Sequence, residues 1–292
     1  MLIESAEKIV DACCGRNWIT ILIVDNASTD DTAEAIRSVI SYGEKKRVRV
    51  TSVYESRLGL SAARNRALDE CRTAIIAFID DDAYIDTAWC DAVRSEFITN
   101  DKTVGCGGPV LPIYSVPKPN WLSRRLLWAY SVGGYGNEDR LYVYPEHPLG
   151  VNMAFSTSKL CGLRFDEDLG RKGENLVSWE ESAYFGRIMR NGGQIKYLSS
   201  ATVFHIISED RLTKNWLMKR HIAEGRSVAM ALIADPDAKL LNPVNIVKSV
   251  IAASSLLVVS MLFGRTQTGV VLRMKSAYHI SRTLECLVRF QD

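Results

Sequence analysis

Three consecutive aspartates, Asp80, Asp81 and Asp82, follow the apolar run AIIAFI. Alternate side chains of an extended segment point the same way, so Asp80 and Asp82 share one side and Asp81 points elsewhere. Carboxylates about 4 Å apart repel each other by a few kcal/mol at an effective dielectric near 20. Mg²⁺ and Mn²⁺ prefer oxygen ligands and turn this repulsion into coordination. The pattern therefore predicts a divalent metal, with a solvated acidic turn or a helix cap as the alternative.

Asp25 holds an equivalent position, because it ends the apolar run WITILIVD. Such β-branched runs are typical of strands buried on both faces. We expect strands at 18–25, 47–54, 74–80 and 103–112, alternating with helices at 2–14, 28–40, 59–71 and 87–97. This alternation predicts a parallel sheet covered by helices. Ligands of such sheets bind beyond the carboxyl ends of the strands, so both acidic positions are expected at one edge.

The remainder of the chain has a different character. Residues 112–150 are rich in Pro, Gly, Trp and Tyr. This composition predicts a long, lid-like loop, since loops of this length are usually functional or disordered. A strand and the start of a helix are expected next. They are followed by a helix at 178–193, a strand-like run at 195–206 and helices from residue 211 onward. No internal repeat is evident.

Charge is unevenly distributed along the chain. The formal net charge of +2 does not indicate a nucleic-acid partner. Residues 1–210 hold 24 Lys and Arg against 29 Asp and Glu, whereas residues 211–292 hold 12 against 5. A basic, apolar C-terminal part favours an anionic membrane surface, and scattered solvated charge is the alternative. The apolar stretch at 250–263 is short for a membrane span, so we expect a core or membrane-surface helix there, with spanning less favoured.

The seven cysteines are odd in number and form no C-x-x-C motif. In a chain of 292 residues this pattern indicates reduced, mostly buried thiols. We therefore expect a cytoplasmic protein, held at the cytoplasmic face of the inner membrane by its C-terminal helices.

Several motifs carry a family resemblance. ILIVDNASTDDT, GLSAARNRAL and AFIDDDA, in this order, resemble the nucleotide-binding half of family 2 glycosyltransferases of the GT-A fold. GVNMAFSTSKL, FDEDLG, WEESAYFGRIMRNGG and VFH resemble the acceptor half of that family. The resemblance covers roughly residues 1–206. It implies a GT-A domain over 1–210, with a nucleotide-binding half at 1–111 and an acceptor half at 112–210. The helical region 211–292 is then an appendage, and its basic, apolar composition is the ground for expecting a membrane contact there.

The same resemblance implies a donor site. Asp25 matches the aspartate that binds the nucleotide base, although an aspartate there can simply cap the next helix. Arg64 and Asn65 match residues that face the nucleotide, and a helix-surface arginine is the alternative. Asp80 is expected near the ribose, with Asp81 also among the donor-binding residues. Asp82 is the expected direct ligand of Mg²⁺ or Mn²⁺, with Asp80 beside it. His205 is expected to be a further metal ligand, with a structural histidine as the alternative.

The acceptor half supplies the expected base. Glu181 matches the carboxylate that deprotonates the acceptor hydroxyl, with Glu180 beside it, although acids at a helix start also favour the helix dipole. Trp179 is expected to stack on a sugar or to pack in the core, and Asn152 to touch the sugar. Arg211 and Arg220 would face the diphosphate, or form a basic helix surface.

We therefore expect a metal-dependent, inverting transfer of a sugar from a nucleoside diphosphate to a saccharide or lipid-linked hydroxyl. A nucleotidyltransferase is the first alternative, but no Gly-rich, basic phosphate loop is visible. The second is a non-catalytic binding or assembly subunit, or a degraded transferase copy. Family members begin with a strand that this sequence does not match, because Met1 falls at the first helix. We expect an upstream start or a degraded copy, and strands that lack a partner.

Overall fold

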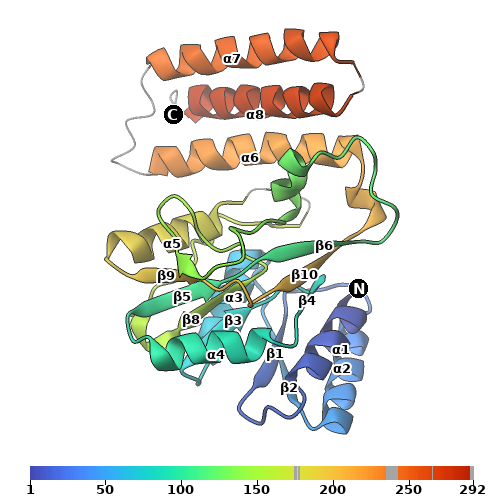
Figure 1. The fold of residues 1–292 in the computed structure, drawn as a ribbon, viewed down its shortest axis with the longest axis vertical. Coiled ribbons are helices and arrows are strands. Elements are labelled where there is room, and N and C mark those ends of the chain that lie inside the picture. The colour runs from blue at the N-terminus through green and yellow to red at the C-terminus, as the bar shows by residue number, and fades with distance from the viewer. Residues whose placement is uncertain (174–175, 177, 235–242, 265, 290–292) are drawn as a thin grey trace. The chain divides into compact units, whose positions relative to one another are not determined.

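The computed structural model describes residues 1–173, 176, 178–234, 243–264 and 266–289 (Figure 1). The chain forms two compact units. The first comprises residues 1–113, 131–167 and 180–206, and the second residues 114–130, 168–179 and 207–292.

The first unit begins with a helix and a parallel strand pair. Helix α1 (Leu2–Cys13) precedes strand β1 (Thr20–Asp25), and helix α2 (Thr32–Lys46) leads to strand β2 (Arg49–Tyr54). The two strands are in register from Thr20 opposite Arg49 to Asp25 opposite Tyr54. The β-α-β pattern expected from the sequence is therefore confirmed here, and Asp25 is the last residue of its strand.

A five-stranded sheet forms the centre of this unit, in the order β3-β8-β5-β9-β7. Its strands are β3 (Ile75–Phe78), β5 (Thr103–Gly107), β7 (Arg140–Leu141), β8 (Met153–Ser156) and β9 (Gln194–Tyr197). Only β5 and β9 are parallel, because β8 runs antiparallel to both β3 and β5, and β7 runs antiparallel to β9. The expectation of a mostly parallel sheet is thus corrected to a mixed one. The physical reason is that β8 returns from the long 112–150 segment and enters between two earlier strands.

A three-stranded sheet has the order β4-β10-β6 and consists of β4 (Ala83–Ile85), β6 (Val110–Tyr114) and β10 (Val203–Ile207). Two predicted strands are therefore each divided between two sheets. The run 103–112 breaks at Gly108, where a Cβ would lie 2.5 Å from the carbonyl oxygen of Leu198. The run 195–206 breaks between β9 and β10.

Helices α3 (Leu60–Glu70), α4 (Trp89–Thr99) and α5 (Glu180–Arg190) complete the first unit. One buried cluster includes Val10 and Cys13 of α1 with Trp89 and Cys90 of α4. The Sγ atoms of Cys13 and Cys90 are 3.9 Å apart. A second cluster is aromatic and packs α5 on the central sheet; its closest ring pair is Phe165 and Tyr184, stacked at 4.0 Å between centroids.

The second unit is helical, as expected from residue 211 onward. Its long helices are α6 (Lys214–Ala234), α7 (Pro243–Leu262) and α8 (Gln267–Arg289), with short 3-10 helices at Arg124–Tyr130 and Glu209–Arg211. Helix α8 packs against both α6 and α7 (Figure 1). Tyr130 stacks on Trp216 with ring centroids 5.0 Å apart, which ties the first 3-10 helix to α6. Within the described residues, no helix has both the length and the apolar character that a bilayer crossing requires.

Candidate functional site

The three aspartates occupy the turn between β3 and β4, which is closed by a hydrogen bond from Ala83 N–H to the Asp80 carbonyl at 3.1 Å. Asp82 is buried, the Asp80 side chain is 31% exposed and Asp81 is exposed. The side chains of Asp81 and Asp82 therefore differ in environment, although both residues lie in a turn and not in the extended segment expected from the sequence.

His205 lies beside Asp82, with its Nε2 atom 3.0 Å from Asp82 Oδ1. The pairing of β10 with β4 explains this contact, because His205 is opposite Ala83, the residue after Asp82. Two carboxylates and an imidazole form a donor set that suits Mn²⁺. Among the described residues, no group of three or more His, Cys, Asp and Glu side chains is already arranged to hold a metal. The structure thus brings together a pair of the three predicted ligands, and their chemistry fits the metal.

Arg64 is buried inside the site rather than on a helix surface. Its guanidinium lies 3.0 Å from Glu180 Oε1, 3.4 Å from Glu181 Oε1 and 3.8 Å from Asp80 Oδ1. The ring of Phe165 lies 5.4 Å away. One cation therefore contacts three carboxyl groups, one on the aspartate turn and two at the start of α5. Carboxylates in such a place are stabilised only while the cation remains.

Glu180 and Glu181 begin α5 and differ in charge. Burial and the charge of Glu181 together raise the pKa of Glu180 to about 8, although Arg64 opposes this shift. Burial also opposes ionisation of Glu181, but Arg64 and His147 outweigh it and hold the pKa of Glu181 below its usual range. At neutral pH the pair therefore contains one protonated carboxyl, on Glu180, and one carboxylate, on Glu181. A charged carboxylate can act as a general base.

Gly150 makes room for this pair. A Cβ atom at Gly150 would overlap Glu181 Oε1 and lie 2.7 Å from Arg64 Nη2. The Gly150 carbonyl also accepts a hydrogen bond from Arg64 Nη2 at 3.5 Å. The glycine of the GVN sequence is thus required by the close approach of the ion pair.

His147 was not predicted from the sequence. Its Nδ1 lies 2.8 Å from the carbonyl oxygen of Pro148, which can only accept, so Nδ1 carries the proton. Nε2 forms a hydrogen bond with the Ser182 hydroxyl at 2.7 Å. The sequence offers one signal for this residue. It is one of four histidines, and it lies three positions before the glycine of GVN.

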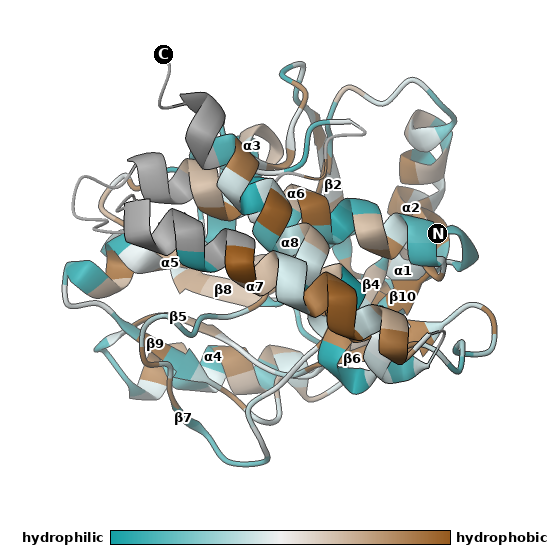
Figure 2. Cartoon of the chain, turned by 90° about the horizontal axis from the view of Figure 1, so that it is seen from above, coloured by the Kyte–Doolittle hydropathy of each residue, from teal (hydrophilic) through white to brown (hydrophobic). Residues whose placement is uncertain are grey.

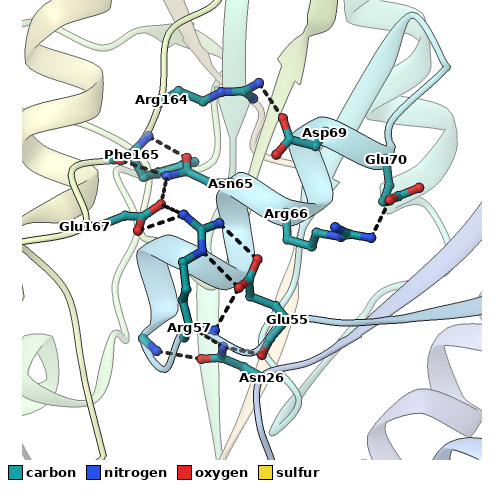
Figure 3. Close-up of polar contacts among 11 residues, drawn as sticks. Asn26, Glu55, Arg57, Asn65, Arg66, Asp69, Glu70, Arg164, Phe165 and Glu167 are labelled. Atoms are coloured by element: carbon teal, nitrogen blue, oxygen red, sulfur yellow. Dashed lines mark hydrogen bonds and ion pairs between the residues drawn. The ribbon is translucent and has the colours of Figure 1, made fainter.

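Asn65 is buried and holds the FDEDLG segment (Figure 3). Its amide nitrogen donates to the Phe165 carbonyl at 3.0 Å and to Glu167 Oε1 at 3.1 Å, and its oxygen accepts from Phe165 N–H at 2.8 Å. Arg57 donates to both Glu167 oxygens and to Glu55, and its guanidinium lowers the pKa of Glu55 to about 2. A contact of Asn65 with a nucleotide would have to replace part of this network.

Two other predicted residues have partners within the protein. Asp25 Oδ1 accepts a hydrogen bond from Ser28 N–H at 3.1 Å. This contact lies in the turn after β1 and is not the expected cap of the next helix, because α2 begins at Thr32 with Asp31 at its N-cap. Asn152 is fully buried, and its amide bonds Trp89 Nε1 at 2.9 Å and the Ala201 carbonyl at 2.8 Å.

In the second unit, Glu224 of α6 accepts hydrogen bonds from two of the predicted residues. They come from Trp179 Nε1 at 3.0 Å and from the buried Arg220 at 2.8 Å. Trp179 has a φ of +85°, which is unusual for a bulky residue.

Comparison with known proteins identifies the class. The family described as glycosyl transferase family 2 matches residues 2–168, more than half of the chain. The chain therefore belongs to glycosyl transferase family 2. Its α/β fold of the GT-A type is confirmed.

The individual relatives are only 25% identical in sequence to this chain. Over 182 residues, 62% of the chain and 58% of the relative, it is 25% identical to a glucosyl-dolichyl phosphate glucuronosyltransferase of Haloferax volcanii. It is also 25% identical over 175 residues to the succinoglycan biosynthesis protein ExoM of Rhizobium meliloti, covering 58% of the chain and 51% of that protein. The chain thus spans between half and three fifths of these relatives.

Among solved structures, the mannosyltransferase PcManGT of Pyrobaculum calidifontis, in complex with GDP-Man and Mn²⁺, superimposes with a TM-score of 0.61 at 19% identity. The superposition covers 98% of the chain and 83% of PcManGT. At this identity the likeness establishes the fold.

Proposed function

We propose that this chain is a metal-dependent, inverting glycosyltransferase that moves a sugar from a nucleoside-diphosphate donor to a hydroxyl of a saccharide or lipid-linked acceptor. The observation that carries the proposal is the buried Arg64, which joins Asp80 on the aspartate turn to Glu180 and Glu181. One set of contacts thus links the residues assigned to the donor with those assigned to the acceptor.

Glu181 is the proposed general base. Its carboxylate is charged at neutral pH because Arg64 and His147 lower its pKa. It takes the proton of the acceptor hydroxyl while that oxygen bonds the anomeric carbon, and the bond from this carbon to the diphosphate breaks on the opposite face. Glu180, protonated beside it, keeps the buried cluster from holding a further negative charge.

Asp80, Asp82 and His205 would hold Mg²⁺ or Mn²⁺. When bound, the metal supplies positive charge that neutralises the departing diphosphate. Support comes from the 3.0 Å contact of Asp82 with His205 and from the carboxylate-rich donor set. PcManGT, which has the same fold, is described with Mn²⁺ and a nucleotide sugar.

Donor and acceptor contacts complete the proposal. Asp25, Arg64, Asn65, Asp80 and Asp81 would serve the donor, and Asn152, Trp179 and Glu180 the acceptor. The names of the relatives in Haloferax and Rhizobium include a dolichyl phosphate and a polysaccharide, which supports a lipid-linked or saccharide acceptor. We further propose a catalytic domain over 1–210 and a helical region over 211–292 that contacts the cytoplasmic face of a membrane.

A thermal-shift screen of nucleoside diphosphates with and without Mn²⁺ tests donor and metal together. A ligand at about a hundred times its Kd adds about 2.7 kcal/mol of stability, which raises Tm by several degrees. We expect such a shift in the wild type and in Asp101→Ala, a control on an exposed turn, and none in Asp82→Ala. A nucleotide shift that is equal with and without Mn²⁺ would refute metal dependence.

The family assignment sets the nucleotidyltransferase alternative aside. A non-catalytic binding subunit is distinguished by turnover. We expect Glu181→Gln to bind donor like the wild type while transfer falls by about 10²–10⁴-fold, the usual contribution of a general base. Donor binding without transfer by the wild type, over a panel of acceptors, would instead select the binding subunit.

A further inference from the structure

One side of α7 is apolar and open to solvent. The most exposed of its apolar side chains are Ile251 (59%), Val258 (62%), Met261 (70%) and Leu262 (82%). Figure 2 shows hydrophobic residues along this helix. Contiguous exposed apolar surface of this kind marks an interaction site more often than chance exposure does.

The opposite side of α7 is covered by α8. Ala253 and Ser260 are buried, and the Ser276 hydroxyl of α8 donates to the Ala253 carbonyl at 2.9 Å. Helix α7 therefore already has one partner along its buried side, and the exposed side chains point away from that partner. We call the surface formed by Ile251, Val258, Met261 and Leu262 the α7 face.

The distribution of charged residues around the α7 face indicates which kind of partner it fits. No charged residue occurs from 249 to 264, while Lys248 precedes and Arg265 follows this stretch in the sequence. Lys248 is exposed, and residues 211–292 hold 12 basic against 5 acidic residues. An apolar helix surface that follows an exposed lysine, in a region of basic sequence, suits the boundary between acyl chains and anionic headgroups, where cationic side chains reach the phosphates.

We propose that the α7 face docks on an anionic lipid bilayer, with the helix lying along the membrane surface. A second copy of the chain fits less well, because a two-fold interface pairs a surface with itself and brings like charges together. The proposal deepens the proposed function by naming the surface that would meet a lipid-linked acceptor. Its test nevertheless involves no sugar transfer.

The experiment is sedimentation of the full chain with phosphatidylcholine vesicles, with and without phosphatidylglycerol. We expect binding to the anionic vesicles that weakens as salt rises, and at least a tenfold lower partition coefficient for Val258→Asp/Leu262→Asp. Ile98→Asp is the matched control, because Ile98 of α4 is 64% exposed and lies in the first unit. This control should bind like the wild type.

A second variant protects the test against misfolding. Leu262→Trp places an indole at the most exposed position of the α7 face, and its fluorescence should shift to the blue when anionic vesicles are added. No wild-type binding, or equal binding by the doubly substituted variant, overturns the proposal. So does a lipid-free dimer that the Val258→Asp/Leu262→Asp change dissociates, since a second copy would then occupy the surface. Vesicle binding without transfer activity would refute the proposed function alone.

Discussion

At the scale of single residues, the site depends most on Arg64. Its guanidinium is the cation that Asp80, Glu180 and Glu181 share, and the carboxylates of α5 begin a helix more than a hundred positions further along the chain. Removing one partner of a buried ion pair leaves charge that neither water nor protein compensates.

We expect Arg64→Met to lower the free energy of unfolding by about 3–5 kcal/mol, measured by urea denaturation. The matched control is Arg66→Met on the same helix. Arg66 is 37% exposed and pairs with Glu70, so its loss should cost at most about 1 kcal/mol. Equal effects of the two substitutions would contradict the assigned role of Arg64.

Glu180 gives stability a defined pH dependence. Its pKa is about 8 in the folded chain and near the usual 4.5 in the unfolded chain, so between these values the folded state holds the extra proton. This contribution is complete below pH 4.5 and is lost as pH rises through 8. One proton corresponds to at most about 1.4 kcal/mol per pH unit. The free energy of unfolding of the wild type should therefore fall as pH rises from 5 to 8. In Glu180→Gln we expect this fall to be shallower by about 1.4 kcal/mol per pH unit. Glu70→Gln, at the exposed C-terminal end of α3, should leave the decline as in the wild type.

At the scale of elements, the segment before β8 positions the ion pair. Gly150→Ala would push a methyl group into Glu181 and Arg64. Because a misplacement of about 1 Å can cost 10²-fold in rate, we expect a loss of that order in transfer activity. Gly133→Ala is the control, since its Cβ would meet only Leu149 Cδ1, at 3.9 Å. Unchanged transfer by Gly150→Ala would show that the pair tolerates displacement.

The elements also show what the sequence could and could not predict. Local periodicity predicted β1, β2, β3 and the helices between them, and it found the acids at the strand ends. It could not predict that β8 enters antiparallel between β3 and β5, because that pairing joins distant segments. For the same reason the contact of Arg64 with α5 was missed, and an apparent surface arginine lies at the centre of the site.

At the scale of the whole molecule, the two compact units predict two thermal transitions, since separate cores need not unfold together. Except for Trp179, all proposed catalytic, donor, acceptor and metal residues lie in the first unit. We expect Mn²⁺ and a nucleoside diphosphate to raise only one transition in calorimetry. Leu217→Ala, which leaves a cavity at a fully buried position of α6 in the second unit, should lower the other. A single transition that both changes move together would contradict independent units.

The neighbouring thiols of Cys13 and Cys90 have a practical consequence. Their sulfurs are 3.9 Å apart and need to approach by only about 2 Å to reach disulfide length. We therefore expect prolonged storage in air to form a disulfide between α1 and α4, which closes a loop of 77 positions. Such a closure can add about 4 kcal/mol. Preparations kept with and without reductant would then differ in heat resistance for a reason unrelated to substrate.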